Sequence, residues 1–345
     1  MNLSRPLLTG VLCATLGAAP AHAAVDRVVE KTFPVEPGGT LEVATYGGNI
    51  QVIAGAGNQV KVEAHEHIHA DSEAEADDLL KKLTLTIEPA GTGVSARAEY
   101  ERQDFGFHWG SWPAVQVSFV VTVPTRFAAN LHTSGGNIVV GDLKGAVDAR
   151  TSGGNERFGK IGADIEASTS GGNITLAAAS GTISLSTSGG NIVVGYAGGP
   201  AVLRTSGGDI KIGGAASTVS ARTSGGNVSA VFTGALAGDC LLSTSGGRVR
   251  ATVASGAGFH LDAATSGGEV QADGLAITIE RSGAHRSSLS GAVGGGGPEL
   301  RLRSSGGNIE ISGDRGSAAN APVSRPAFSP MAEGQIPLQA EAALL

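Results

Sequence analysis

Hydrophobic and polar positions recur with a fixed period through the middle of the chain. The motif Thr-Ser-Gly-Gly begins, at equal spacing, at Thr133, Thr151, Thr169, Thr187, Thr205 and Thr223. Slightly longer steps lead to Thr244 and Thr265, and a related Ser304-Ser305-Gly306-Gly307 follows after a gap that fits two coils, one of them degraded. This self-similar period of about 18 residues predicts a solenoid in which each repeat forms one coil.

Within each repeat, apolar and polar residues alternate in two short stretches. Two residues after the second glycine, eight of nine repeats carry Ile or Val, and Glu156 is the exception. A second alternating stretch follows, as at Val147 and Ala149. Period-two alternation predicts two short strands with one face inward. Stacked coils then pair in parallel about 4.8 Å apart. The expected fold is all-β, a parallel β-solenoid (β-helix), and parallel crossovers favour a right-handed winding.

The repeated Gly-Gly-Asn predicts a structural corner between the two strands of a coil. Glycine tolerates positive φ and close backbone approach, which a tight stacked corner requires. The corner residues of four successive repeats are Gly135, Gly136, Asn137, Gly153, Gly154, Asn155, Gly171, Gly172, Asn173, Gly189, Gly190 and Asn191. A coil this short encloses only one layer of side chains, so we expect ligands to use the outer faces, the corners or the ends.

The region 24–130 lacks this period and is expected to form a β-rich cap. It contains several alternating segments and a capping box, Ser72-Glu73-Ala74-Glu75, which predicts one short helix. A cap is physically expected, because an open solenoid end exposes unpaired strand edges. The solenoid itself is assigned to 131–315. The tail 316–345 is rich in Ala, Pro and Ser without periodicity, and is expected to be disordered.

The segment 1–23 has the pattern of a signal peptide. Arg5 is its only charge, an apolar run follows, and Ala21-His22-Ala23 has the small-x-small form of a cleavage site. The apolar run is too short to serve as a transmembrane anchor. We therefore expect an exported protein that is periplasmic, secreted or located at the cell surface.

Charge and cysteine content narrow the partners further. The chain carries a formal net charge of −7, and removing residues 1–23 takes away only one Arg, so it stays acidic. An acidic chain without a basic cluster argues against nucleic acid as a partner. Only Cys240 remains after that segment, so no internal disulfide is available. Stability is then expected to come from packing and backbone pairing.

Several motifs together resemble a known family. They are Phe33-x-Val35 with Gly38-Gly39, then Tyr46-Gly47-Gly48-Asn49-Ile50, then Val121-Thr122-Val123-Pro124 before the repeated Thr-Ser-Gly-Gly-Asn-Ile. The chain is similar over about residues 28–312 to a bacterial β-strand-repeat family of unknown function, whose members are often labelled adhesins. The resemblance implies the architecture. It brings no catalytic residues with it, and analogy of fold is weak support for function.

A histidine-rich strand is the first candidate site. His65, His67 and His69 are expected on one face of a strand, and two such histidines at i and i+2 can chelate a divalent metal such as Zn²⁺ or Cu²⁺. All three cannot bind one ion, because the outer two lie about 13 Å apart along an extended strand. A further ligand would have to come from elsewhere, with Glu63 and His108 as candidates. The alternative is a solvated face that happens to be rich in histidine. No other cofactor is expected.

An aromatic segment and an arginine pair are the other candidates. Phe105, Phe107, Trp109 and Trp112 lie in a Gly-containing stretch, where they suit contact with a ligand or partner, or else pack over the first coil. The outward positions of the coils look like a solvated face. Two of them, Arg204 and Arg222, should be direct neighbours, which is unfavourable unless an anion or carboxylate lies nearby.

The sequence contains no motif of a known enzyme class. It has no Gly-x-Ser-x-Gly elbow, no phosphate loop and no His-Glu-x-x-His. The expected function is therefore that of a non-enzymatic envelope or surface protein, presenting a solenoid for adhesion or for interaction with a protein or glycan. One alternative is a periplasmic structural or regulatory partner with a metal-binding cap. A less favoured alternative is a polysaccharide-active β-helix enzyme, which would need clustered Asp, Lys or Arg on one exposed sheet.

Overall fold

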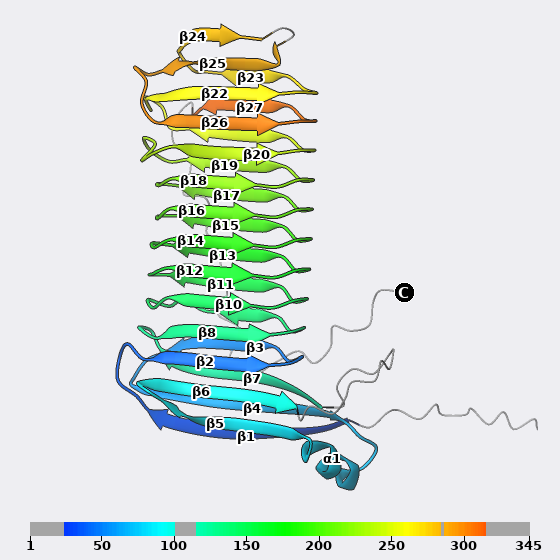
Figure 1. Ribbon diagram of the computed structural model, residues 1–345. Coiled ribbons are helices and arrows are strands. Elements are labelled where there is room, and N and C mark those ends of the chain that lie inside the picture. The colour runs from blue at the N-terminus through cyan, green and yellow to red at the C-terminus, as the bar shows by residue number, and fades with distance from the viewer. Residues whose placement is uncertain (1–23, 101–114, 284–285, 315–345) are drawn as a thin grey trace, which may run out of the picture.

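Two long β-sheets face each other along the described part of the protein (Figure 1). The computed structural model describes residues 24–100, 115–283 and 286–314. It confirms the expected all-β class, with parallel strands stacked coil upon coil as a solenoid and one short helix in the cap. The expected signal peptide and the expected disordered tail lie outside the described residues.

Both sheets are built from strands far apart in the sequence. Sheet A contains 13 strands, in the spatial order β1 (Ala24–Pro34), β4 (Gln59–His69), β7 (Val115–Pro124), β3 (Ile50–Gly55), β9 (Ile138–Val140), β11 (Glu156–Ile161), β13 (Ile174–Ala179), β15 (Ile192–Ala197), β17 (Ile210–Ala215), β19 (Val228–Phe232), β21 (Val249–Val253), β27 (Ile309–Gly313) and β23 (Val270–Asp273). Sheet B contains 14 strands, in the order β24 (Ile277–Ser282), β25 (Ser288–Val293), β22 (Phe259–Thr265), β26 (Glu299–Ser304), β20 (Cys240–Thr244), β18 (Val219–Arg222), β16 (Ala201–Arg204), β14 (Ile183–Ser186), β12 (Ile165–Ser168), β10 (Val147–Arg150), β8 (Ala128–Thr133), β2 (Thr40–Thr45), β6 (Gly93–Tyr100) and β5 (Leu83–Ala90).

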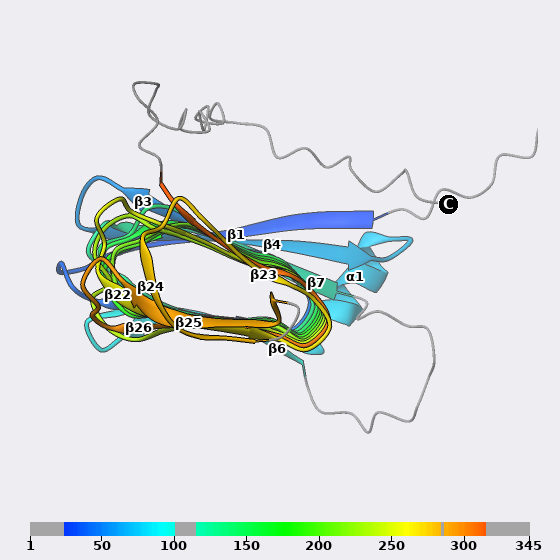
Figure 2. The same cartoon turned by 90° about the horizontal axis from the view of Figure 1, so that it is seen from above.

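Each coil of the repeat region contributes one strand to each sheet, in the predicted register. In sheet A, β13 pairs with β15 so that Ile174 lies beside Ile192. In sheet B, β12 pairs with β14 so that Ile165 lies beside Ile183. Viewed along the stack, the coils superpose into one flattened outline (Figure 2). One period of the sequence therefore corresponds to one lateral step between neighbouring strands. The hand of the winding stays a prediction.

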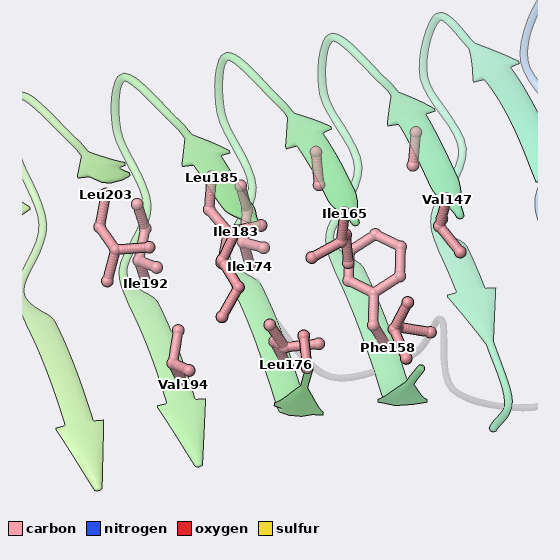
Figure 3. Packing of buried hydrophobic residues seen from close by; sticks show 14 of the residues in the cluster. Val147, Phe158, Ile165, Ile174, Leu176, Ile183, Leu185, Ile192, Val194 and Leu203 are labelled. Carbon is pink, nitrogen blue, oxygen red and sulfur yellow. The ribbon is translucent and has the colours of Figure 1, made fainter. Parts of the chain in front are cut away.

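The inward side chains of the two sheets fill the space between them. Phe158, Ile174 and Leu176 of sheet A point toward Ile165 and Ile183 of sheet B (Figure 3), and each is at most 1% exposed. Burying a side chain of this size contributes about 1.5–3 kcal/mol relative to leaving it exposed. No coil encloses its own apolar residues, because the coils above and below cover part of each inward side chain. Packing is therefore shared along the whole stack.

The corner threonines tie successive coils together. Thr169 Oγ1 donates a hydrogen bond to the carbonyl oxygen of Gly154 in the preceding coil at 2.9 Å, and accepts one from the backbone N–H of Gly172 at 3.3 Å. Outside this pair runs a ladder of side chains, in which Asn155 donates from its backbone N–H to Asn137 Oδ1 at 2.8 Å. Backbone groups that would be left unpaired at a corner are satisfied by these side chains.

Of the two reasons expected for the corner glycines, the structure shows close backbone approach and not a positive φ. Among the described residues, none of the corner glycines has a positive φ. Instead, the second glycine of each corner lies directly against the corner of the preceding coil, and a Cβ on Gly154 would stand 1.9 Å from the Gly136 carbonyl oxygen. Close backbone approach, and not a left-handed conformation, excludes a side chain there.

The cap continues both sheets without a break. β2 and β3 form a first coil whose Thr45 is buried in the corner, and β8 and β9 stack on it. β7 and β6 lie below this coil in parallel, and the edges are closed by antiparallel β4, β1 and β5. Helix α1 (Glu73–Leu80) is capped by Ser72, whose side chain accepts from the Glu75 backbone N–H. Because the sheets are continuous, the boundary near residue 130 stays a prediction.

The last coil is out of sequence order, which corrects the expectation of simple sequential stacking. β26 and β27 lie between β20–β21 and the earlier strands β22–β23, and pair in parallel with both neighbours (Figure 1). The segment expected to be a degraded coil instead forms β24 and β25, which pair antiparallel with each other and cover β22. The chain thus passes over one level of the stack and fills it last.

Candidate functional sites on the outer faces

The outer face of sheet B carries regular columns of arginine and acidic residues. Arg150 forms ion pairs with Asp148 at 3.0 Å and with Glu166 at 3.1 Å. Nearer the other end of the stack, Arg301 pairs with Glu299 at 2.8 Å, and Arg303 pairs with Asp262. At these positions the columns neutralise their own charge, as a solvated sheet face requires.

Arg204 and Arg222 are the exception, and the structure places them side by side as expected. They are cross-strand partners on β16 and β18, and both are exposed. Neither forms an ion pair with any described residue. The same column carries Ser186 on one side and Ser243 on the other. Two like charges therefore face each other without a compensating carboxylate.

A groove of about 380 Å³ lies beside Arg222, and its lining also includes Asp239 and Glu299. Its floor is a cross-strand column of half-buried side chains, Val202, Ser220 and Leu241. Arg222 lies on one side of the groove, and Arg301 continues the floor column. No sequence motif marks this groove. The longer repeat before β20 can be seen in the sequence, but the groove beside it cannot be predicted from that length.

The outer face of sheet A exposes apolar side chains among unpaired cations. Tyr196 is 44% exposed and Val193 38% exposed on β15. Arg157 and Lys211 lie in the column of Val193, which pairs with Lys211 directly. Neither cation forms an ion pair with a described residue. The ion pairs of this sheet lie nearer its ends, for example between Lys61 and Glu30 and between Arg250 and Glu310.

The histidine-rich strand is β4, and its side chains alternate as predicted. His67 Nδ1 lies 2.6 Å from Asp26 Oδ1 on the neighbouring strand β1, and the rings of His67 and His69 meet edge to face at 4.8 Å. His65 Nε2 is 3.6 Å from Glu63 Oε2. Among the described residues, no group of three or more His, Cys, Asp or Glu side chains is arranged to hold a metal ion. Metal binding here stays a prediction, and His108 lies outside the described residues.

The aromatic candidates Phe105, Phe107, Trp109 and Trp112 also lie outside the described residues. On either side of them, β6 ends at Tyr100 and β7 begins at Val115. The Tyr100 ring meets Tyr46 edge to face, with ring centroids 6.1 Å apart. Burial raises the pKa of Tyr100 to about 12. The role of the four aromatic candidates as ligand or partner contacts stays a prediction.

Glu156, which stands where the other repeats carry Ile or Val, is a buried carboxyl group. It occupies an inward position of β11, between Ile138 and Ile174, and is 1% exposed. Neither carboxylate oxygen has a hydrogen-bond partner among the described residues. Burial raises its pKa to about 8, the Asp148 carboxylate adds to the rise, and the Ser168 backbone opposes it in part. The group lies in the packed core, away from the groove, and is a source of instability.

None of the described helices is long and apolar enough to cross a membrane.

No curated protein sequence matches the chain significantly. Among the solved structures that resemble it, three each cover 83% of this chain. A "putative adhesin" from Bacteroides fragilis is 12% identical over 97% of its own length, with a TM-score of 0.38. A "putative lipid binding protein" from Parabacteroides distasonis is 14% identical over 96% of its length (TM-score 0.43). A "putative adhesin" from the same species is 10% identical over 97% (TM-score 0.32).

At these identities and TM-scores the solved structures carry no argument about ligands or activity. A family model gives the firmer assignment, because it matches residues 39–312. The match begins just before β2 and ends within β27, so it includes the first coil, the cap strands other than β1 and the repeat region. The resemblance to a β-strand-repeat family of unknown function is thereby confirmed. The chain belongs to the Toastrack DUF4097 family.

Proposed function

We propose that this protein is an exported envelope or surface protein that binds a protein or glycan partner through the outer faces of its solenoid, without catalysing a reaction. The observation that carries the proposal is the filled interior. The space between the two sheets is occupied by buried side chains, so a partner has only the outer surfaces to contact. Flat faces lined by regular side-chain columns suit an extended partner.

The distribution of charge supports binding in preference to catalysis. The two carboxyl groups with a raised pKa, Glu66 and Glu156, point inward among apolar residues and away from the groove. A general acid or base has to reach its substrate. Of the acidic residues that line the groove, Glu299 forms an ion pair with Arg301, and Asp239 accepts a hydrogen bond from the Glu299 backbone N–H at 2.8 Å.

Protease shaving of intact cells tests the location that this function requires. The protein is detected in the released and retained fractions, with a periplasmic protein as the control for intact outer membranes. Loss from intact cells supports display at the surface. Resistance until the outer membrane is opened contradicts adhesion, and leaves the envelope role with a periplasmic partner.

A second candidate is a periplasmic partner protein whose cap binds a divalent metal. The observation in its favour is the short contact between His67 and Asp26, because a carboxylate on one ring nitrogen orients a histidine for metal binding through the other. The test is calorimetric titration of the protein with Zn²⁺. We expect His67→Ala to abolish binding and His132→Ala, an exposed histidine on β8, to leave it intact. Equal binding by both variants would rule the site out.

A further inference from the structure

We propose that Arg204, Arg222 and the adjoining groove form a binding site for an acidic polysaccharide whose sugar units carry carboxylates. The proposal rests on the proposed function and specifies its ligand. The first argument is the unpaired charge. Arg204 and Arg222 are cross-strand neighbours without a carboxylate, whereas Arg150, Arg301 and Arg303 on the same face all have one.

Such a pair is unfavourable in the free protein. Like charges directly opposite each other on adjacent strands destabilise a sheet. The neighbouring positions of this column show that serine fits there equally well, as at Ser186 and Ser243. A carboxylate that accepts hydrogen bonds from both guanidinium groups removes the repulsion, because arginine binds carboxylates in a planar, two-pronged geometry.

The groove supplies the remaining contacts. It extends beside Arg222 over the strands β16, β18, β20 and β26, which corresponds to about 14 Å between the outer strands. Val202 and Leu241 offer aliphatic surface, and the hydroxyl groups of Ser220 and Thr218 offer hydrogen bonds. The far end carries two carboxylates, Asp239 and Glu299, and Glu299 pairs with Arg301, so the free positive charge lies at the Arg204–Arg222 end. An elongated ligand with its acidic group at that end fits this polarity.

The topology favours a glycan over an acidic peptide. Extended peptides gain much of their affinity by adding a strand to an exposed sheet edge. β16 and β18 lie in the middle of sheet B, and both of their edges are already paired. A ligand here is recognised by side chains alone. A polysaccharide needs no strand edge, because its hydroxyl and carboxylate groups bind side chains directly.

The test measures binding of oligogalacturonate to the purified protein by calorimetry at physiological salt. The double variant Arg204→Ser/Arg222→Ser introduces the serine that other coils carry at this position. The matched control is Arg150→Ser, which removes one arginine from the same column, three strands away from Arg204 at about 14 Å. That distance exceeds the screening length of about 8 Å at physiological salt. Urea unfolding of each variant verifies that the solenoid is intact.

We expect the double variant to bind at least about tenfold more weakly, and the Arg150→Ser variant to bind like the wild type. Methyl-esterified oligogalacturonate, which has lost the negative charge, should also bind at least about tenfold more weakly. No binding by the wild type, or equal binding by the double variant, overturns the site. Equal affinity for poly-glutamate overturns the assignment to a glycan. Cell-surface exposure does not enter this measurement, so its failure and failure of the proposed function are distinguishable.

Discussion

Gly154 lies so close to Gly136 of the preceding coil that a Cβ on Gly154 would stand 1.9 Å from the Gly136 carbonyl oxygen. The equivalent contact recurs between Gly172 and Gly154 and between Gly190 and Gly172, also at 1.9 Å. The atom in the way is backbone in each case, so no side-chain movement relieves it. The spacing of the strands is thereby enforced by the second glycine of each corner.

Replacing Gly154 by alanine should destabilise the protein strongly, whereas replacing its neighbour Gly153 should not. A Cβ on Gly153 meets nothing nearer than the Gly135 carbonyl oxygen at 3.8 Å, an ordinary contact. We expect Gly154→Ala to lower the free energy of unfolding by about 2–4 kcal/mol, as overpacking does. Gly153→Ala should change it by less than about 0.5 kcal/mol. Urea denaturation compares the two, and equal losses would contradict a steric role specific to the second glycine.

The corner threonine should tolerate serine but not valine. Thr169 is buried and makes two hydrogen bonds through its hydroxyl group, one to each of two coils. Valine keeps the shape but leaves a backbone N–H and a carbonyl unpaired, which costs about 1–3 kcal/mol. Ser304 in the last coil already makes the equivalent bonds, to Gly247 and from Gly307. Thermal unfolding of Thr169→Ser and Thr169→Val checks this, and a Val variant as stable as the Ser variant would refute it.

Glu156 should make the protein less stable as the pH rises. Its pKa is about 8 in the folded protein and near 4.5 when exposed, so the folded state holds an extra proton between these values. The free energy of unfolding therefore falls as pH rises from about 4.5 to about 8. Glu156→Ile, which matches Ile138 and Ile174, should stabilise the protein by roughly 3–5 kcal/mol more at pH 8.5 than at pH 4.5.

Glu156→Gln separates the charge from the shape at this position. The amide cannot ionise, so this variant should lose the same pH dependence as Glu156→Ile while keeping a buried polar group and gaining less stability. Urea unfolding across this pH range measures both. The interpretation fails if the wild type and the Gln variant show parallel profiles.

Removing the last coil should destabilise the end of the stack, while removing only the segment beyond Asp314 should not. Leu300, Leu302, Ile309 and Ile311 are at most 1% exposed, and each contributes about 1.5–3 kcal/mol of hydrophobic free energy. The entropy of ordering the coil offsets part of this. A chain ending at Pro298 also leaves β20–β21 and β22–β23 without partners on one side. We expect its urea midpoint to fall and that of a chain ending at Asp314 to remain unchanged. Equal midpoints would mean that the two separated coils pair directly.

Much of the fold was predictable, because in a solenoid one period along the chain corresponds to one step between strands. Thr133 and Thr151 occupy the same position of consecutive repeats, and the structure places them one coil apart. The period therefore predicted the parallel pairing, and the alternation predicted the inward face. The capping box at Ser72 likewise predicted α1 from local chemistry. The prediction of a positive φ at the corner glycines was wrong, whereas the prediction of close backbone approach is confirmed. Contact between neighbouring coils decides which of the two applies.

The candidate sites could be predicted less well from the sequence than the fold. Asp26 and His67 are 41 residues apart, so their contact depends on the pairing of β1 with β4. The groove combines residues of β16, β18, β20 and β26, the last of which comes from the intercalated coil. The adjacency of Arg204 and Arg222 was predictable from the period. The absence of a described carboxylate beside them was not.

The sequence alone determined the coil: its two strands, its apolar face, its Thr and Asn corner and its parallel stacking. All of these depend on interactions between a residue and its counterpart one period away. Tertiary structure decided the order of the last coils, the pairing of the cap strands and the groove on sheet B. Identical strand edges are interchangeable as far as local sequence is concerned, so only the packing of the whole chain selects which coil occupies which level.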